Sequence, residues 1–221
     1  MEKTDFLPGT SLRIKQRNDM FRFNSDTAAL AAFVDVRKHD RILDVGTNNG
    51  VLLLASLVKG GKEGVGIDLF DEAIELAKEN AVLNEITNAK FIVCPIEFFD
   101  SKAFDLIVCN PPYFKLSTKY TKLSPFLDAA HYERSMPLTM LAKHAFRLLK
   151  ENGRFCIVHR ADRINEISTV LSSEHFAIKR IRFIHHDIDR PAVGVLIEAM
   201  KNGSNLCSVE APLIHKRGES L

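Results

Sequence analysis

The sequence predicts an α/β fold with one mostly parallel sheet of seven strands and helices on both of its faces. From residue 41 onward, short apolar runs alternate with longer segments whose apolar residues recur at helical spacing, as they do where helices connect parallel strands. The short runs are rich in Val, Ile and Phe, which favour buried strands. With 221 residues, 46% of them hydrophobic, the chain suits one domain over residues 1–221 better than two small ones.

The elements follow in order along the chain. A lead-in over residues 1–40 contains the helical pattern FRFNSDTAALAAFVDV, which we expect to cover the sheet. In the core, residues 41–221, helices are expected at 51–61, 71–84 and 135–153, the last with Pro137 in its first turn and Gly153 as its stop. The strands are expected at 41–45, 64–68, 89–94, 104–109, 154–159, 178–184 and 192–199.

Composition excludes several classes of protein. No run of about 18 apolar residues is present, as a membrane span requires, and the first residues lack the apolar stretch of a secretory signal. We therefore expect a cytoplasmic protein with no membrane partner. The four cysteines form no CxxC pair, and His185 and His186 lack companions at metal spacing, so no metal is expected.

Charge is distributed unevenly, although the net charge is only +2. Residues 1–110 carry 13 Lys and Arg against 17 Asp and Glu, whereas residues 111–221 carry 17 against 11. A basic half is compatible with nucleic-acid binding. Scattered surface charge is the alternative that composition leaves open.

A glycine turn follows the first core strand in ILDVGTNNGVLLL, residues 42–54. Asp44 precedes it, and a carboxylate there repels a pyrophosphate but attracts a cation. The turn also lacks the G-x-G-x-x-G of a dinucleotide site. S-adenosylmethionine carries an ammonium and a sulfonium but no phosphate, so it suits this turn better than NAD. Because open α/β sheets bind ligands at the carboxyl ends of their strands, we assign cofactor binding to Asp44, Gly46, Thr47, Asn48, Asn49 and Gly50.

A second acidic residue ends the next strand. Asp68 lies 22 residues beyond Gly46, where an acid can accept hydrogen bonds from two ribose hydroxyls. Leu69 follows it and is assigned to the same site. In the structural alternative, Asp44 caps the glycine turn and Asp68 caps the next helix.

These residues resemble the first motifs of the class I S-adenosylmethionine-dependent methyltransferases, which have a Rossmann-like fold and an acid followed by G-x-G-x-G. Asn48 stands where the middle glycine is usual. Asn tolerates left-handed backbone angles better than most residues, so we expect the turn to survive. The resemblance also implies an acid after the third strand that bonds the adenine amino group. Here CPIEFF offers Glu97, with Ile96 against the adenine face.

The fourth strand runs directly into Asn110, Pro111, Pro112 and Tyr113. We assign these four residues to catalysis, and Asn110 also to the cofactor site. The amino group of an aromatic ring is a poor nucleophile because its lone pair is delocalised. The Asn110 side-chain oxygen and the Pro111 carbonyl can accept its two N–H bonds and favour the pyramidal nitrogen that attacks a methyl group. The prolines fix the turn, and Tyr113 can stack on the target base. A turn that merely ends the strand is the alternative.

The sequence NPPY resembles the motif of the amino methyltransferases, which act on adenine, cytosine, guanine or glutamine. Two further stretches, 7–33 and 129–167, resemble the bacterial adenine-N6 methyltransferases that modify adenine 37 of a valine tRNA, and 179–203 matches that family's final hairpin. The resemblance implies a tRNA substrate. It rests on Phe21, Phe23, Asp26, Thr27, Ala130, His131, Glu133, Val158, His159, Arg163, Glu166 and Ile167.

Contacts to RNA are expected after the NPPY motif and after the fifth strand. Cations can bind phosphates while rings stack on bases. A solvated loop at 114–134, and an ion pair of Arg163 with Glu166, are the alternatives. Because no strong base is needed, we interpret His131 and His159 as structural. The substrate-binding residues we assign are Phe114, Lys115, Lys119, Lys122, Arg160 and Arg163.

The sequence is also compatible with two other functions. A release-factor glutamine methyltransferase shares NPPY but typically has a helical N-terminal domain, for which 40 residues are too few. A binding module that has lost turnover is the alternative outside enzymes. We expect a monomer or weak dimer.

Overall fold

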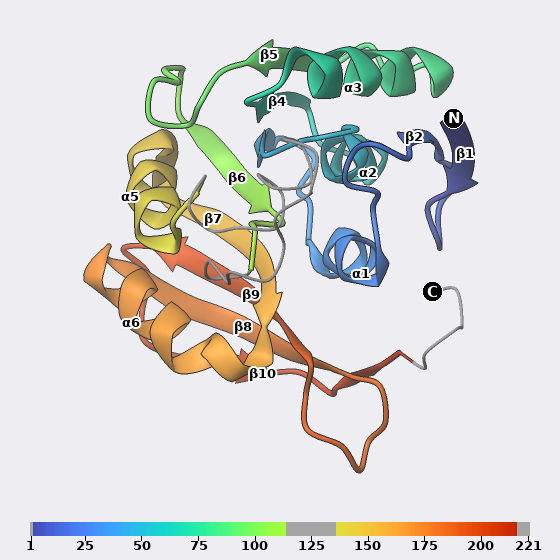
Figure 1. Cartoon of the computed structure of the whole chain (residues 1–221). Coiled ribbons are helices and arrows are strands. Elements are labelled where there is room, and N and C mark those ends of the chain that lie inside the picture. The colour runs from blue at the N-terminus through green and yellow to red at the C-terminus, as the bar shows by residue number, and fades with distance from the viewer. Residues whose placement is uncertain (1, 114–135, 216–221) are drawn as a thin grey trace, which may run out of the picture.

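A twisted sheet forms the centre of the protein (Figure 1). The computed structural model describes residues 2–113 and 136–215. Within these residues nine strands form this sheet, in the order β10-β8-β9-β7-β6-β3-β4-β5, with β11 also paired to β8. The strands are β3 (Arg41–Val45), β4 (Glu63–Asp68), β5 (Ala89–Val93), β6 (Phe104–Cys109), β7 (Leu149–Arg160), β8 (Phe176–His185), β9 (Gly194–Lys201), β10 (Ser208–Val209) and β11 (Leu213–Ile214).

Strand directions confirm the predicted sheet and locate its functional edge. Strands β5, β4, β3, β6 and β7 are parallel neighbours, and β9 is antiparallel to both β7 and β8. All seven predicted strands are present, and β10 and β11 are two-residue additions at one edge. Val45 pairs with both Ile67 and Cys109. The segments that follow β3, β4 and β6 therefore leave the sheet at the same edge.

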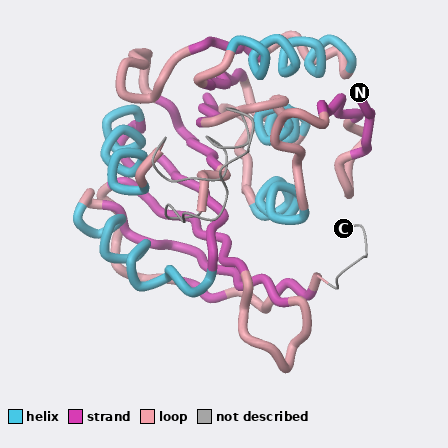
Figure 2. Tube along the Cα trace, viewed as in Figure 1, coloured by secondary structure: helices cyan, strands magenta, loops and turns pink. Residues whose placement is uncertain are grey.

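Helices cover both faces of the sheet, as predicted (Figures 1 and 2). Helices α5 and α6 lie on one face, and α1, α2 and α3 lie on the other. The short 3-10 helix η2 joins β7 to α6. The helices are α1 (Ser25–Phe33), α2 (Val51–Val58), α3 (Asp71–Leu83), α5 (Leu138–Leu148), η2 (Ala161–Arg163) and α6 (Ile164–Ser173).

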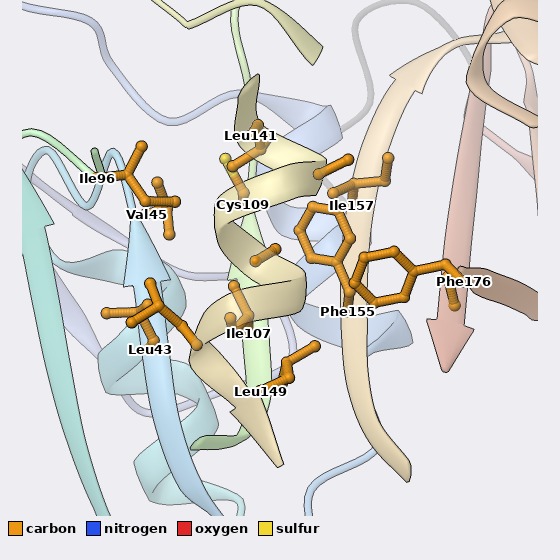
Figure 3. Close-up of a cluster of buried hydrophobic side chains, with 14 of the residues drawn as sticks. Leu43, Val45, Ile96, Ile107, Cys109, Leu141, Leu149, Phe155, Ile157 and Phe176 are labelled. Atoms are coloured by element: carbon orange, nitrogen blue, oxygen red, sulfur yellow. The ribbon is translucent and has the colours of Figure 1, made fainter. Parts of the chain in front are cut away.

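The alternation of side chains along the strands produces two cores. Ile42 and Leu106 are buried on the face of α1 and α2. Leu43 and Ile107, one residue further along each strand, are buried on the face of α5 and α6, and Figure 3 shows them beside α5 with Phe155. Burying each large apolar side chain stabilises the fold by about 1.5–3 kcal/mol. The continuous apolar runs of β3 and β6 thus reflect burial on both faces.

The predicted helix at 135–153 is wrong at its C-terminal end. Helix α5 stops at Leu148, and Leu149 is already extended, with ψ 144°. The chain then turns through Asn152, which has a left-handed φ of 57°, and Gly153, where a Cβ would lie 2.8 Å from a backbone oxygen. The register between β6 and β7 shifts here. Gly153 therefore permits an irregular backbone within β7 and does not mark the end of a helix.

The N-terminal hairpin and helix α6 were not predicted from the sequence. Strands β1 (Glu2–Phe6) and β2 (Arg13–Arg17) form an antiparallel hairpin within the lead-in, and α6 lies between β7 and β8. The hairpin lies outside the main sheet. It packs against α3, so it depends on a helix that begins more than 50 residues later in the sequence.

A buried ion pair joins the connection before β3 to β7. Arg154 Nη2 donates to Asp40 Oδ2, and its Nη1 donates to the carbonyl of Asp35. The two side chains of the pair are only 3% and 6% exposed. Such a pair is costly to break because the remaining charge stays buried.

No helix in residues 2–113 and 136–215 is long and apolar enough to cross a membrane. Within the same residues, no group of three or more His, Cys, Asp and Glu side chains is placed to hold a metal ion.

Candidate functional site

The glycine turn between β3 and α2 has the predicted backbone geometry. Gly46 and Gly50 have φ of 69° and 81°, and Asn48 has φ 49°, so Asn occupies the left-handed region in place of the middle glycine. The N–H groups of Gly46 and Thr47 both donate to the Ile67 carbonyl, at 2.9 Å each. The turn is therefore fixed to β4, and the expectation that it survives the Asn is confirmed.

Asp44 lies beneath this turn. Its Oδ2 accepts hydrogen bonds from Thr47 Oγ1 at 2.7 Å and from the Leu53 N–H at 3.2 Å, so its observed contacts match the turn-capping alternative. The side chain is 1% exposed, and burial raises the pKa of Asp44 to about 7. Two buried atoms, Asp44 Oδ1 and Asn49 Nδ2, have no hydrogen-bond partner among the described residues.

The substitution Asp44→Asn should flatten the pH dependence of stability. The folded-state pKa of Asp44, about 7, is higher than that of an unfolded aspartate, about 3.9. Stability from this group is therefore fully present below about pH 4 and lost as the pH rises through about 7. In urea unfolding of the ligand-free protein, we expect wild type to lose about 2–3 kcal/mol more than the variant between about pH 5 and pH 7.5. An equal loss in both proteins would contradict this assignment.

Asp68 ends β4 with its carboxylate bonded to backbone N–H groups. Its Oδ2 accepts from Asn48 at 2.9 Å, and its Oδ1 accepts from Leu69 at 2.8 Å and Phe70 at 3.2 Å. Burial raises the pKa of Asp68. Two carboxylate oxygens offer about four acceptor positions, so three N–H donors leave capacity for a ligand hydroxyl. The residue thus ties the glycine turn to the start of α3, and its ribose contact stays a prediction.

Asn110 and Tyr113 contact each other at the end of β6. The Tyr113 hydroxyl donates to Asn110 Oδ1, and Asn110 Nδ2 donates to Thr27 Oγ1 at 3.0 Å. Asn110 Oδ1, which we predicted to accept a hydrogen bond from the target amine, thus already accepts one from the Tyr113 hydroxyl. Burial raises the pKa of Tyr113 well above its ordinary value, so this hydroxyl keeps its proton. A target amino group has to replace it at Asn110.

One residue of β7 and one residue of η2 contact Tyr113. The ring of His159 lies 5.0 Å from the Tyr113 ring, centroid to centroid, and His159 is 2% exposed, which fits the structural role we expected. Arg163 Nη1 donates to the Tyr113 carbonyl at 3.2 Å. Its Nε and Nη2 bond Glu166 at 3.0 and 2.6 Å, so the ion pair considered as an alternative is formed.

The structure describes one of the other five residues that were predicted to contact RNA. Arg160 is partly exposed and pairs with Asp162 through Nε and Nη2. Its phosphate contact stays a prediction. The other four predicted contacts lie outside the described residues: Phe114, Lys115, Lys119 and Lys122.

A cavity of about 300 Å³ opens between these segments. Its described lining contains three carboxylates, from Asp26, Asp68 and Glu97, and no Lys, Arg or His. Burial also raises the pKa of Asp26. Asp44 and Gly50 are not among the described lining residues. The other predicted residues in the lining are Gly46, Thr47, Asn48, Asn49, Leu69, Ile96, Asn110, Pro111, Pro112 and Tyr113.

The lead-in closes one side of the cavity. Met20, Phe21 and Phe23 line it. Asn48 Nδ2 donates to the Phe21 carbonyl at 2.5 Å, a bond that glycine at this position cannot make. Buried Gln16 accepts the Phe23 N–H at 2.9 Å. The family resemblance marked Phe21 and Phe23 without giving them a role, and the structure places them in the cavity wall.

Asn80, on α3, connects the glycine turn to the N-terminal hairpin, a role that was not predicted from the sequence. Its side chain is fully buried. Its amide accepts the Lys15 N–H at 2.7 Å and donates to the Lys15 carbonyl at 3.1 Å and the Asn49 carbonyl at 2.9 Å. Asn84, one helical turn later, bonds the N–H and carbonyl of Arg13 in the same way. Only Asn80 also reaches the glycine turn.

Asn80→Ala should lower both stability and cofactor affinity. We expect a loss of about 2–3 kcal/mol in stability, since buried backbone groups of Lys15 and Asn49 lose their partner. Asn84→Ala is the matched control because it removes two hydrogen bonds to the hairpin but leaves the Asn80 contact to Asn49 in place. Thermal unfolding and calorimetric titration with S-adenosylmethionine measure the two effects. Equal affinity losses in the two variants would show that the hairpin, not the turn contact, controls binding.

The cavity fits S-adenosylmethionine. The described lining is acidic and contains no cationic side chain, which suits a ligand that is positively charged and lacks phosphate. The unpartnered atoms Asp44 Oδ1 and Asn49 Nδ2 lie in the turn that would hold the positively charged tail of this ligand. Asp68 and Ile96 also line the cavity, and their contacts to the ribose and the adenine stay predictions. When bound, this cofactor supplies a methyl group on a sulfonium.

A parallel α/β sheet with this cavity at the ends of β3 and β4 defines a class I methyltransferase, and the cofactor of that class is S-adenosylmethionine. A protein-family model described as "Methyltransferase domain" matches residues 36–204. Because the match covers more than half of the chain, this protein belongs to the methyltransferase domain family.

Similar proteins act on different acceptors. A tRNA1(Val) (adenine(37)-N6)-methyltransferase of Flavobacteriaceae bacterium is 30% identical over 66% of this chain, and the match spans 62% of that relative's length. One of the same name from Dyadobacter fermentans is 27% identical over 83% of this chain and 77% of its own length. A release factor glutamine methyltransferase of Fusobacterium nucleatum is 33% identical over 63% of this chain but only 42% of its own length.

A solved structure supports the fold. The M. jannaschii tRNA m1G37 methyltransferase superposes with a TM-score of 0.69 at 16% identity, covering 92% of this chain and 57% of that protein. At this identity the likeness concerns the fold alone.

Proposed function

We propose that this protein transfers a methyl group from S-adenosylmethionine to the N6 amino group of an adenine in tRNA, with adenine 37 beside the anticodon of a valine tRNA as the expected target. One observation carries the proposal. The Asn110 side chain lies in the wall of the same cavity as Gly46 and Asp68, so an amine held by Asn110 is next to the cofactor turn.

The chain's own residues position the amine. Asn110 Oδ1 and the Pro111 carbonyl accept its two N–H bonds, which favours the pyramidal nitrogen. Pro111 and Pro112 restrict the backbone of the turn. No strong base is required, because the N–H becomes acidic once the methyl group has been transferred. The Tyr113 ring is free to stack on the base after its hydroxyl has left Asn110.

Adenine in tRNA is favoured over other acceptors by two kinds of support. The relatives that match the larger share of their own length are named for adenine 37 of tRNA1(Val), and the sequence stretches beyond NPPY resemble that family. Bases of an anticodon loop are already unpaired, which lowers the cost of presenting one to the cavity. RNA contacts then fall to Arg160 and the basic residues after Tyr113.

Glutamine in a release factor is the second candidate, because one relative named for that activity is 33% identical to this chain. The Asn110 clamp accepts a carboxamide nitrogen as readily as a ring amine. We also propose that residues 1–221 act as one domain, as a monomer or weak dimer in the cytoplasm.

An assay with labelled S-adenosylmethionine distinguishes tRNA from a release factor as the methyl acceptor. The protein is incubated with total tRNA or with a release factor, and the tRNA is digested to nucleosides. Label in N6-methyladenosine supports the proposal. Label in N2-methylguanosine, label in the release factor alone, or no label in any acceptor rejects it.

A further inference from the structure

The side-chain amide of Asn110 can serve as an amine clamp in only one of its two orientations. Its oxygen has to face the target, because two N–H donors cannot bind the N–H bonds of an amine. A flipped amide would fill the same space with the opposite hydrogen-bonding character. Some neighbouring group therefore has to select the orientation.

That neighbour is Thr27, in the first turn of α1. Thr27 is 3% exposed and lines the cavity. Its Oγ1 accepts Asn110 Nδ2 at 3.0 Å and lies 3.2 Å from Asn24 Oδ1. Thr27 is 83 residues before Asn110 in the sequence.

Each bond in this chain fixes the next one. The Thr27 backbone N–H donates to the Asn24 side chain at 3.0 Å, so the atom of Asn24 at that position is its oxygen. The only proton of the Thr27 hydroxyl then goes to that oxygen, since a carbonyl oxygen can only accept. The hydroxyl is left as an acceptor towards Asn110, so the NH₂ group of Asn110 faces Thr27 and its oxygen faces the Tyr113 hydroxyl in the cavity wall.

We propose that Thr27, held by the N-cap Asn24 of α1, is a positioning residue that sets the Asn110 amide so that its oxygen receives the target amino group. The inference rests on the proposed function, in which Asn110 binds an amine. The lead-in helix α1 thereby has a role in the reaction, because its N-cap determines which end of the Asn110 amide faces the target amine.

Thr27→Val tests the proposal because it keeps the branched shape and removes the acceptor. A buried N–H left without a partner costs about 1–3 kcal/mol, so in this variant Thr27 no longer holds the amide with its oxygen towards the target. We expect kcat to fall by about tenfold or more, with the KM for tRNA and the Kd for S-adenosylmethionine within about threefold of wild type. Thr27→Ser keeps the hydroxyl and should retain kcat within about threefold.

Ser25→Ala is the matched control, since it removes a hydroxyl from the same turn and Ser25 is not in the described lining. Thr27→Ala replaces the valine variant if that protein does not fold. Retention of more than half of kcat in both hydroxyl-free variants overturns the proposal. So does an equal loss in Thr27→Ser, which would trace the effect to the missing methyl group.

A second measurement does not depend on the substrate. In the ¹⁵N-labelled protein without ligand, the Asn110 side-chain NH₂ should have one proton slowed in exchange by its bond to Thr27. This protection should disappear in Thr27→Val and persist in Thr27→Ser. Unchanged protection in the valine variant overturns the inference even if tRNA is methylated. If the protection is lost in Thr27→Val but the wild-type protein methylates no tRNA, the proposed function alone is rejected.

Discussion

Asn110→Ala should abolish methyl transfer while the protein still binds S-adenosylmethionine. Removing a pre-oriented hydrogen-bonding group that acts in the transition state typically lowers kcat by about 10²–10³-fold. The glycine turn, Asp44 and Asp68 bond to each other and to backbone groups, so the cofactor side of the cavity does not depend on this amide. Single-turnover assays with tRNA and calorimetry with the cofactor measure the two properties separately.

The matched control for this variant is Asn88→Ala. Asn88 makes the same kind of side-chain bond, to the Lys62 carbonyl at 3.0 Å, but it directly precedes β5 and so lies at the opposite edge of the sheet from Asn110. We expect wild-type turnover for it. Unchanged turnover in Asn110→Ala would remove NPPY from the mechanism, and loss of cofactor binding with turnover would show that Asn110 serves the cofactor instead.

Arg154→Ala should cause the largest loss of stability. Asp40 would keep its bond from the Arg37 N–H, at 2.7 Å, but its buried charge would have no cation. Breaking one partner of a buried pair costs about 3–5 kcal/mol. For a protein of this size the loss corresponds to a fall of roughly 10 °C in Tm, which thermal unfolding measures.

Lys150→Ala provides the comparison on the surface. Lys150 pairs with Asp105 at 2.7 Å, but its side chain is 50% exposed. An exposed pair is worth about 0–1 kcal/mol, so we expect a shift of only a few degrees at most. The double variant Arg154→Met with Asp40→Ala should regain part of the stability lost in Arg154→Ala. Equal shifts in the two single variants would contradict the assignment of burial as the cause.

The core of the fold was predictable because its signals are local. The apolar runs at 41–45 and 104–109 match β3 and β6 to the residue, since strands buried on both faces leave continuous apolar sequence. The end of α5 was not predictable. The residues after Leu148 suit a helix, but pairing with β6 draws Leu149 into the sheet. Tertiary contacts overrode local preference there.

The candidate site likewise has features that the sequence predicts and features that only the tertiary structure shows. The sequence by itself determined which chemistry is available: a glycine turn with Asn48, an acid at a strand end in Asp68, and an amide before two prolines in Asn110. Tertiary structure decided how those groups are oriented, because Thr27 and Asn80 act through hydrogen bonds to residues 83 and 65 positions away. Nothing in a linear pattern records such bonds. Partners distant in sequence meet only when the lead-in folds onto the sheet.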